Sequence, residues 1–281
     1  MTDTTLHYFN GKFVQKHEIQ FSIDDVGLLR GYSVFDFFKA KGEVPIFIDD
    51  HLARLNNSAE KLNLKLPISE AQIRAEIAEL LRINRLDYSS LKIIITGGES
   101  SNGFSPGESK IVILNMPFLD LPDAVYQSGA SLMLNEYTRD FPEVKSTHYA
   151  RALSLQAEWI NGGHIDVLYH EGDFISEVSR SNVFYFEGNK LRTNQVGVLH
   201  GVTRKNVLKC AEGLYDIKIG PISLKDLLNA DEVFITSSTK KVMPIVKVGD
   251  QEIGTGLVGE KTKHLMIAFD QYIDRYVAEN S

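Results

Sequence analysis

The sequence is poor in cysteine: Cys210 is the only one among 281 residues. A single thiol excludes an intramolecular disulfide framework and a cysteine-rich metal site. The eight histidines show no spacing typical of metal ligands, so we expect no metal. No apolar run approaches the length of a spanning helix, so we expect no membrane segment.

Positive charge is also scarce. The chain has 30 Lys and Arg against 37 Asp and Glu, a net charge of −7. A general nucleic-acid binder carries a basic surplus, so we expect no nucleic-acid partner. Residues 1–5 lack the basic and apolar pattern of a secretory leader, so we expect a cytoplasmic protein. The GxGxxG, GxxxxGK[ST] and HExxH motifs are missing as well.

Short strand and helix patterns alternate irregularly along the chain. Asn10-Gly11 between apolar residues predicts a hairpin. Periodic apolar residues predict helices over 52–62, with an Asp cap at Asp49 or Asp50 ahead of it, and over 69–82, 150–161, 203–212 and 261–278. Strands are expected at 33–39, 44–48, 91–96, 110–114, 130–135, 166–169, 183–186 and 232–235. This mixture indicates an α+β fold rather than a doubly wound one.

Two ionisable residues have both a structural and a catalytic interpretation. Lys145 lies in EVKSTHY before a predicted helix, either as a solvated loop lysine or as an amine that acts as a Schiff-base nucleophile. Glu177 lies directly before an apolar strand. It is either a turn carboxylate paired with Arg180 or the partner of a cationic heterocyclic nitrogen.

Three segments suit an anion. Gly201 precedes Val202-Thr203 at a predicted helix start, where free N–H groups can bind phosphate, although a plain Thr-capped helix has the same pattern. The strand at 232–235 runs into four hydroxyl residues, 236–239, of which turn chemistry explains one or two. Arg54 lies in the first turn of a helix, where either an anion or a salt bridge with Asp50 explains it.

Taken together and in order, these segments resemble the class IV (fold type IV) pyridoxal-phosphate aminotransferases. That family includes branched-chain and D-amino-acid aminotransferases and aminodeoxychorismate lyases. The similar segments are FNGKFV, RGYSVFDFF, HLARL, EVKSTHY, ISEVSRSNVFYF, LHGVTRKNVL and DEVFITSST. The resemblance implies a small N-terminal α/β sandwich domain (1–117), a linker (118–128) and a larger pseudo-barrel domain (129–281). It also implies a homodimer in which the neighbouring subunit completes the active site.

The resemblance further implies a site for pyridoxal 5′-phosphate. Lys145 matches the lysine that forms the internal aldimine and shuttles the proton. Tyr149 matches the tyrosine that hydrogen-bonds the phenolic oxygen of the cofactor, and Glu177 the carboxylate that keeps the ring nitrogen protonated. Leu199 matches the apolar residue against the ring. The residues that match the phosphate cup are Arg54, Gly201, Val202, Thr203, Ser237 and Ser238.

The expected substrate residues depart from the better-known subfamilies. Thr96-Gly97-Gly98-Glu99 lacks the Arg-x-His carboxylate trap that is usual in the D-amino-acid enzymes. Branched-chain enzymes usually have a Tyr at position 30, an Ile-Arg pair at 91–92 and a Gly-Thr-Ala turn at 237–239, where this chain has Arg30, Leu91-Lys92 and Ser237-Ser238-Thr239.

We expect Arg30 of the neighbouring subunit to bind the substrate α-carboxylate, assisted by Arg180 or Lys92. The alternative for Arg30 is an ion pair with Asp24 or Asp25. For Lys92, strand alternation offers solvent as the alternative. The resemblance places Phe35 and Thr239 in the same pocket.

The expected function is therefore a transaminase that moves an amino group between an amino acid and a 2-oxo acid by a ping-pong aldimine cycle. We favour a D-amino-acid transaminase. The alternatives are a branched-chain L-amino-acid aminotransferase and an aminodeoxychorismate lyase, which shares every cofactor residue. A non-catalytic binding protein on the same scaffold is disfavoured because Lys145 and Glu177 are both present.

Overall fold

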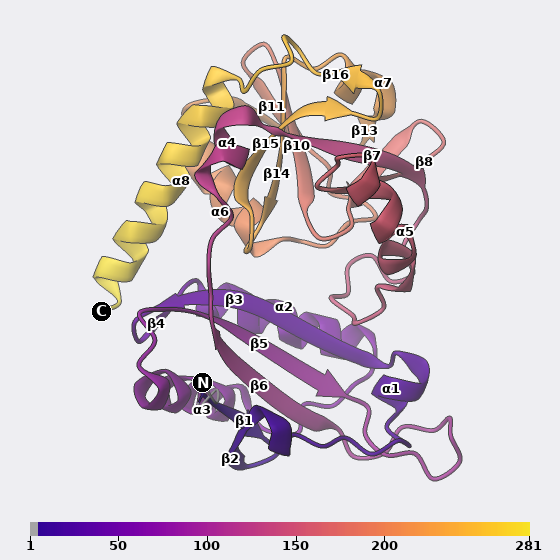
Figure 1. The fold of residues 1–281 in the computed structure, drawn as a ribbon, viewed down its shortest axis with the longest axis vertical. Coiled ribbons are helices and arrows are strands. Elements are labelled where there is room, and N and C mark those ends of the chain that lie inside the picture. Colours follow the sequence, from indigo (N-terminus) through magenta and orange to yellow (C-terminus); the bar gives the residue numbers. More distant parts are fainter. Residues whose placement is uncertain (1–4) are drawn as a thin grey trace. The chain divides into compact units, whose positions relative to one another are not determined.

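The computed structural model describes residues 5–281, which form two compact units. The first comprises the described residues up to Leu119 with Val144–His148 and Tyr276–Ser281; the second comprises Asp120–Glu143 and Tyr149–Arg275 (Figure 1). The division at Leu119 falls inside the segment 118–128 expected to be a linker, yet Asp123–Ser128 of that segment form helix α4. The expectation that residues 1–5 do not begin a secretory leader depends mainly on residues 1–4, which lie outside the described residues.

The first unit is built on a six-stranded antiparallel sheet in the order β2-β1-β6-β5-β3-β4. Its strands are β1 (Leu6–Phe9), β2 (Lys12–Gln15), β3 (Ser33–Lys41), β4 (Val44–Pro45), β5 (Tyr88–Thr96) and β6 (Lys110–Pro117). Its helices are η1 (Lys16–Glu18), α1 (Val26–Arg30), α2 (Ile48–Lys61) and α3 (Glu70–Asn84). The predicted hairpin is confirmed, because Phe9 pairs with Lys12 across Asn10 and Gly11, whose φ angles of 46° and 90° belong to a primed turn.

Helices α2 and α3 cover one face of this sheet. Their apolar residues pack with inward side chains of β3, β5 and β6 into one core. Side chains alternate along β3, so Val34 and Phe38 enter that core while Phe35 lies on the opposite face. Helix α2 begins at Ile48, earlier than expected, which corrects the predicted Asp cap: Asp49 and Asp50 lie within the first turn, and the N-cap is Phe47.

The second unit is built on a ten-stranded sheet that forms a half-barrel, in the order β12-β11-β10-β14-β15-β7-β8-β9-β13, with β16 paired to β15. Its strands are β7 (Ala130–Glu136), β8 (Asp166–Glu171), β9 (Phe174–Val178), β10 (Asn182–Glu187), β11 (Lys190–Thr193), β12 (Asp216–Ile219), β13 (Ile222–Ser223), β14 (Glu232–Ser237), β15 (Lys241–Val248) and β16 (Gln251–Glu252). Its helices are α4 (Asp123–Ser128), α5 (Ala150–Asn161), α6 (Val202–Ala211), α7 (Leu224–Leu228) and α8 (Glu260–Glu279), whose last residues, from Tyr276, belong to the first unit.

The two faces of the second sheet have different coverings. Helix α5 packs through Leu155 and Trp159 onto Val167 and Tyr169 of β8. Helix α6 contacts β14, and the rings of Phe184 and Phe234 stack at 4.8 Å in neighbouring strands. The other face holds the apolar core of the unit. Two sheets, mostly antiparallel, with helices packed on them confirm the predicted α+β class. Within residues 5–281, no helix has both the length and the apolar composition needed to cross a membrane.

Candidate active site

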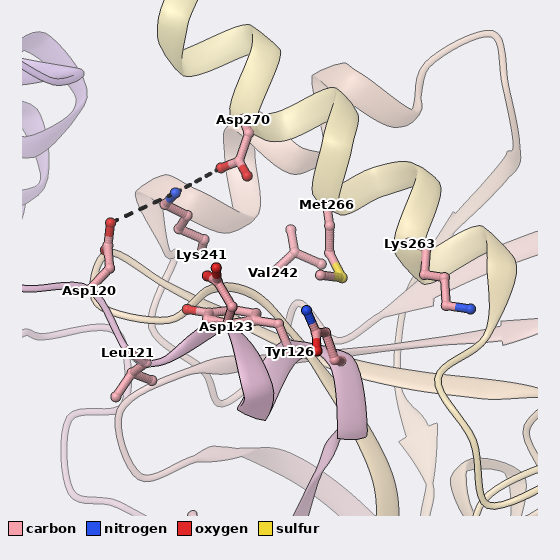
Figure 2. A pocket seen from close by; sticks show the side chains of 10 residues that line it. Asp120, Leu121, Asp123, Tyr126, Lys241, Val242, Lys263, Met266 and Asp270 are labelled. Atoms are coloured by element: carbon pink, nitrogen blue, oxygen red, sulfur yellow. Dashed lines mark ion pairs between the residues drawn. The ribbon is translucent and has the colours of Figure 1, made fainter.

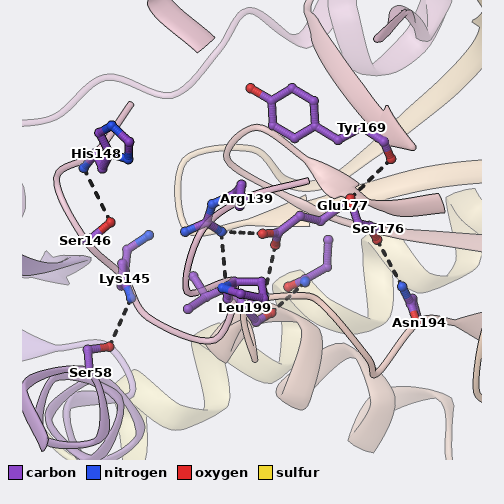
Figure 3. Close-up of polar contacts among 12 residues, drawn as sticks. Ser58, Arg139, Lys145, Ser146, His148, Tyr169, Ser176, Glu177, Asn194 and Leu199 are labelled. Carbon is purple, nitrogen blue, oxygen red and sulfur yellow. Dashed lines mark hydrogen bonds and ion pairs between the residues drawn. The ribbon is translucent and has the colours of Figure 1, made fainter. Parts of the chain in front are cut away.

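Lys145 lies on a short extended segment beside β3. The backbone of Phe35 donates to the Lys145 carbonyl at 2.9 Å, and Ser146 forms a bridge with Val34. The Lys145 N–H donates to Ser58 Oγ of α2 at 3.1 Å (Figure 3). The Lys145 ammonium lies 4.6 Å from the centre of the Phe35 ring. The backbone of Lys145 is therefore fixed by both β3 and α2, which positions its amine over an aromatic face.

Lys92 belongs to the same aromatic contact. Its ammonium lies 5.2 Å from the centre of the Phe35 ring, on the sheet face opposite α2 and α3. Burial lowers the pKa of Lys92. Its side chain therefore covers an aromatic ring instead of extending freely into solvent, and two cations, those of Lys92 and Lys145, contact one ring.

Arg54 is held by a buried carboxylate. Its Nε and Nη2 donate to the two oxygens of Asp36, each at 2.8 Å, and His51 Nδ1 lies 2.7 Å from Asp36 Oδ1. Burial raises the pKa of Asp36, but Arg54 and His51 outweigh it and keep that pKa well below its ordinary value. This bidentate pair replaces the salt bridge with Asp50 that was the expected alternative. The Nη1 atom of Arg54 forms no hydrogen bond with the described residues.

Arg30 lies at the end of α1 and is exposed. Its Nε donates to the carbonyl of Gly103 at 3.1 Å. The carboxylate of Asp25 is used otherwise, because it caps α1 at Gly27 and accepts from Thr96. Among the described residues Arg30 forms no ion pair, so the structure does not contain the alternative pair with Asp24 or Asp25.

Glu177 is the buried carboxylate of the second unit. It is 3% exposed, and it pairs with Arg139 and accepts a hydrogen bond from the Leu199 N–H at 3.1 Å (Figure 3). The expected alternative partner, Arg180, is directed elsewhere. Burial opposes the charge on Arg139, but Glu177 outweighs it and keeps the pKa of Arg139 above its ordinary value. Glu177 is therefore a fixed anion in the interior of the unit.

The N-terminus of α6 is open to an anion. Its N-cap is Gly201, which has no side chain to cap the first N–H groups. A Cβ at Gly201 would lie 2.0 Å from Asn182 Oδ1, so a larger residue there would displace the Asn182 amide. Asn182 also donates to the Leu199 carbonyl at 2.7 Å. These contacts hold the loop before α6 against β10 and leave its helical N–H groups available.

Three of the four hydroxyl residues 236–239, at the end of β14 and just after it, have contrasting partners. Ser237 and Thr239 lie 3.2 Å apart through their hydroxyls, and Ser237 Oγ accepts from the Lys240 N–H, as in an ordinary turn. Thr236 is 1% exposed, and its hydroxyl has no hydrogen-bond partner among the described residues. Because Thr236 pairs in register with Asn182, this unpartnered hydroxyl lies on the strand next to the loop that leads into α6.

Asp166 at the start of β8 forms a second buried carboxylate cluster. Its Oδ2 accepts from Lys240 Nζ at 3.0 Å and from Arg180 Nη2 at 3.2 Å, and its Oδ1 accepts from the hydroxyl of Ser179. Burial raises the pKa of Asp166, but the two cations outweigh it and lower that pKa. Burial lowers the pKa of Lys240.

A cavity of about 350 Å³ lies elsewhere in the second unit (Figure 2). It is lined by Asp120, Leu121, Asp123, Tyr126, Gln127, Lys241, Val242, Lys263, Met266 and Asp270. Lys241 in its wall is paired with Asp270 at 2.9 Å and with Asp120 at 3.9 Å. None of the predicted site residues lines this cavity, and the charges in its wall are already partly matched.

The predicted residues separate between the two units. The first unit carries Arg30, Phe35, Arg54, Lys92 and Lys145. The second unit carries Tyr149, Glu177, Arg180, Leu199, Gly201, Val202, Thr203, Ser237, Ser238 and Thr239. Within the second unit, Leu199 contacts Glu177 directly, and Tyr149 packs against the cluster of α5 and β8.

Among the residues missed from the sequence, Asp36, Arg139, Asn182 and Lys240 each hydrogen-bond a predicted site residue directly. Each has a charged or amide side chain whose partner is not evident from the neighbouring residues. The partners of Arg139 and Lys240 lie 38 and 74 residues away. Only Asn182 had a local signal, because it stands next to the polar run 179–181 at the start of a strand.

Comparison with known proteins identifies the family. The model of the class IV amino-transferase family matches residues 33–248. A protein of Methanocaldococcus jannaschii, provisionally named a branched-chain-amino-acid aminotransferase, is 30% identical over 93% of this chain and 94% of its own. D-alanine aminotransferase of Bacillus licheniformis is 27% identical over 94% of this chain and 96% of its own.

A solved structure shows the same fold. The branched-chain amino acid aminotransferase from Escherichia coli has a TM-score of 0.85 at 23% identity and covers 96% of this chain and 95% of its own. The chain belongs to the class IV aminotransferase family. Members of this family use pyridoxal 5′-phosphate, and the chain is accordingly a pyridoxal-phosphate-dependent transaminase.

Proposed function

We propose that this chain is a D-amino-acid transaminase that works as a homodimer, with Lys145 as the residue that binds the cofactor. The observation that carries the proposal is the pair of cations on one sheet face: Lys92 and Lys145 both contact the ring of Phe35. An amine for the chemistry and a second cation for a carboxylate are thereby available together.

The residues of the second unit fit the cofactor. A helix terminus at Gly201 without a capping side chain and the unpartnered hydroxyl of Thr236 suit a phosphate. Val202 and Thr203 would offer their N–H groups, and Ser237 and Ser238 would complete the cup. In the first unit, Arg54 would add its guanidinium, held in orientation by Asp36.

When bound, the cofactor supplies an electron sink that stabilises the negative charge left on the substrate Cα after proton removal. Lys145 would hold the cofactor through Nζ and would carry the proton to and from the substrate Cα. Glu177 would keep a proton on the ring nitrogen, because Arg139 and the Leu199 N–H hold Glu177 in place and ionised. Tyr149 would hydrogen-bond the phenolic oxygen, and the Leu199 side chain would pack against the ring.

Substrate carboxylates are proposed to bind Arg30, Lys92 and Arg180, with Phe35 and Thr239 beside them. Arg30 and Lys92 depart from the usual branched-chain residues, and the chain lacks the Arg-x-His trap that is usual in the D-amino-acid enzymes. A branched-chain L-amino-acid aminotransferase is the second candidate, favoured by the identity to the archaeal relative. An aminodeoxychorismate lyase would share the same cofactor residues.

The homodimer is proposed from the surface around Arg30. The segment before α1 and the loop between β5 and β6 lie together through the Asp25–Glu99 bridge and the Arg30–Gly103 hydrogen bond. This surface exposes Phe21, Ile23, Leu28, Leu29 and Phe104. Several exposed apolar side chains on neighbouring segments are typical of an interface, and a second copy of the chain would bury them next to the arginine.

The test is the first half-reaction of the holoenzyme with single amino donors. D-Ala and D-Glu should discharge the visible absorbance of the bound cofactor, and L-Leu and L-Ile should not. Discharge by the L-donors alone supports the branched-chain candidate, and pyruvate release from aminodeoxychorismate supports the lyase. Arg30→Ala should raise KM for amino and keto acids together by about tenfold or more, the size expected for a lost charged hydrogen bond. An unchanged KM removes Arg30 from the site.

A further inference from the structure

Asp166 has more partners than its own charge requires. Its Oδ1 accepts from the Val167 N–H at 2.9 Å and from Ser179, and its Oδ2 accepts from Lys240 and Arg180. The side chain of Asp166 is fully buried and that of Lys240 is 6% exposed, whereas that of Arg180 is 52% exposed. Arg180 by itself would neutralise the carboxylate, so Lys240 is an additional buried cation.

A buried cation must be compensated, because desolvation of an ammonium costs several kcal/mol. The single carboxylate of Asp166 faces two basic groups, so the cluster carries one positive charge in excess. Both cations share the same oxygen, and Arg180 uses only Nη2 for it. Its Nε and Nη1 form no hydrogen bond within residues 5–281. The surplus charge therefore resides on the half-exposed guanidinium, where an anionic ligand has access.

The turn that carries Lys240 also links this cluster to the predicted ligand residues. Ser237 pairs with Lys241 across the turn, and the Lys240 N–H donates to Ser237 Oγ. Arg180 lies three residues after Glu177, in the loop that joins β9 to β10. A single turn therefore carries both a hydroxyl of the proposed phosphate cup and the ammonium that shares the carboxylate with Arg180.

We propose that Lys240 is a positioning residue for substrate: it neutralises Asp166, so that Arg180 keeps a full positive charge for a substrate carboxylate. This proposal rests on the proposed function only in that Arg180 is taken to contact substrate. Without Lys240, Asp166 and Arg180 form a closed neutral pair, and the guanidinium is drawn toward Asp166. If Lys240 had only a structural role, the affinity for a substrate carboxylate would not follow the net charge of the Asp166 cluster.

The test compares the holoenzyme with the variants Lys240→Met, Asp166→Asn and Lys240→Met/Asp166→Asn. Calorimetric titration with butanoate, a carboxylate without an amine, measures binding independently of turnover. Lys240→Met should weaken butanoate binding about tenfold, the loss expected when a charged donor is engaged elsewhere. The double variant leaves Arg180 as the only charged member of the cluster and should recover affinity to within about twofold of the wild type, within the usual error of additivity.

Lys241→Met is the matched control, because this neighbouring lysine pairs with Asp270 and should leave butanoate affinity unchanged. The proposal is overturned if Lys240→Met binds butanoate like the wild type, or if the double variant binds no better than Lys240→Met. If the wild type transfers no amino group but the butanoate pattern is still observed, the proposed function fails and the charge assignment stands. Circular dichroism identifies a variant that fails to fold, and the double variant, which has no unpaired buried charge, still decides the question.

Discussion

Asp36 and Asp166 are both fully buried aspartates that hold two basic side chains, one in each unit, yet the two clusters differ in charge. Asp36 receives a bidentate arginine that is 9% exposed and a histidine whose pKa burial lowers, so the histidine is neutral at pH 7. Asp166 receives a buried lysine and a half-exposed arginine, both cations when the carboxylate is present. One buried aspartate thus balances the charge of its cluster, whereas the cluster of the other aspartate keeps one positive charge in excess.

The largest expected effect is on the balanced cluster. Asp36→Asn leaves Arg54 buried without its carboxylate, which should cost about 3–5 kcal/mol in the free energy of unfolding, measured with urea. Asp49→Asn is the control, because Asp49 is 82% exposed in its pair with Arg74 and should cost less than about 0.5 kcal/mol. A loss below about 1 kcal/mol for Asp36→Asn contradicts a tightly held cluster.

The second effect is a dependence of stability on pH. Burial lowers the pKa of His51, so as the pH falls from 7 to 5 the unfolded chain takes up a proton there before the folded chain does. The free energy of unfolding should therefore fall over this range, by up to about 1.4 kcal/mol per pH unit for this one group. His51→Gln should flatten that slope, while His17→Gln, a change at an exposed histidine, should not. Equal slopes for His51→Gln and the wild type would contradict the conclusion that His51 causes this pH dependence of stability.

The smallest expected effect is on the cluster with surplus charge. Asp166→Asn should cost about 1–2 kcal/mol, less than Asp36→Asn, because Arg180 is half solvated and Lys240 can release its proton. The pKa of Asp166 is lowered, so its contribution is present above an ordinary aspartate pKa and is lost as the pH falls below it. Urea unfolding at pH 7 measures the difference. A cost equal to that of Asp36→Asn removes the distinction between the clusters.

Local patterns in the sequence predicted much of the fold. The hairpin follows from Asn10-Gly11, helix α3 covers Glu70–Asn84 where 69–82 was predicted, and α5 spans the predicted residues 150–161. In each case the signal lies within a few neighbouring residues. The predicted start of α2 was wrong. Two acidic residues near a helix start give the same sequence pattern whether one of them caps the helix or both lie in its first turn.

The candidate site was predictable only as a set of segments. Lys145 and Glu177 were identified from the ordered resemblance, but their surroundings were not. For Glu177 and Arg54 the sequence suggested nearby partners, and the structure provides Arg139 and Asp36 instead. Strand pairing and helix packing bring together residues far apart in the chain, and no local pattern encodes which distant charge will arrive.

The most direct test of the whole account is to reduce the purified holoenzyme with borohydride and map the modified peptide by mass spectrometry. We expect one phosphopyridoxyl group per chain, attached to Lys145, with loss of the visible absorbance. Attachment to another lysine such as Lys92, or a protein that stays colourless with excess cofactor and carries no modified lysine, would contradict the account.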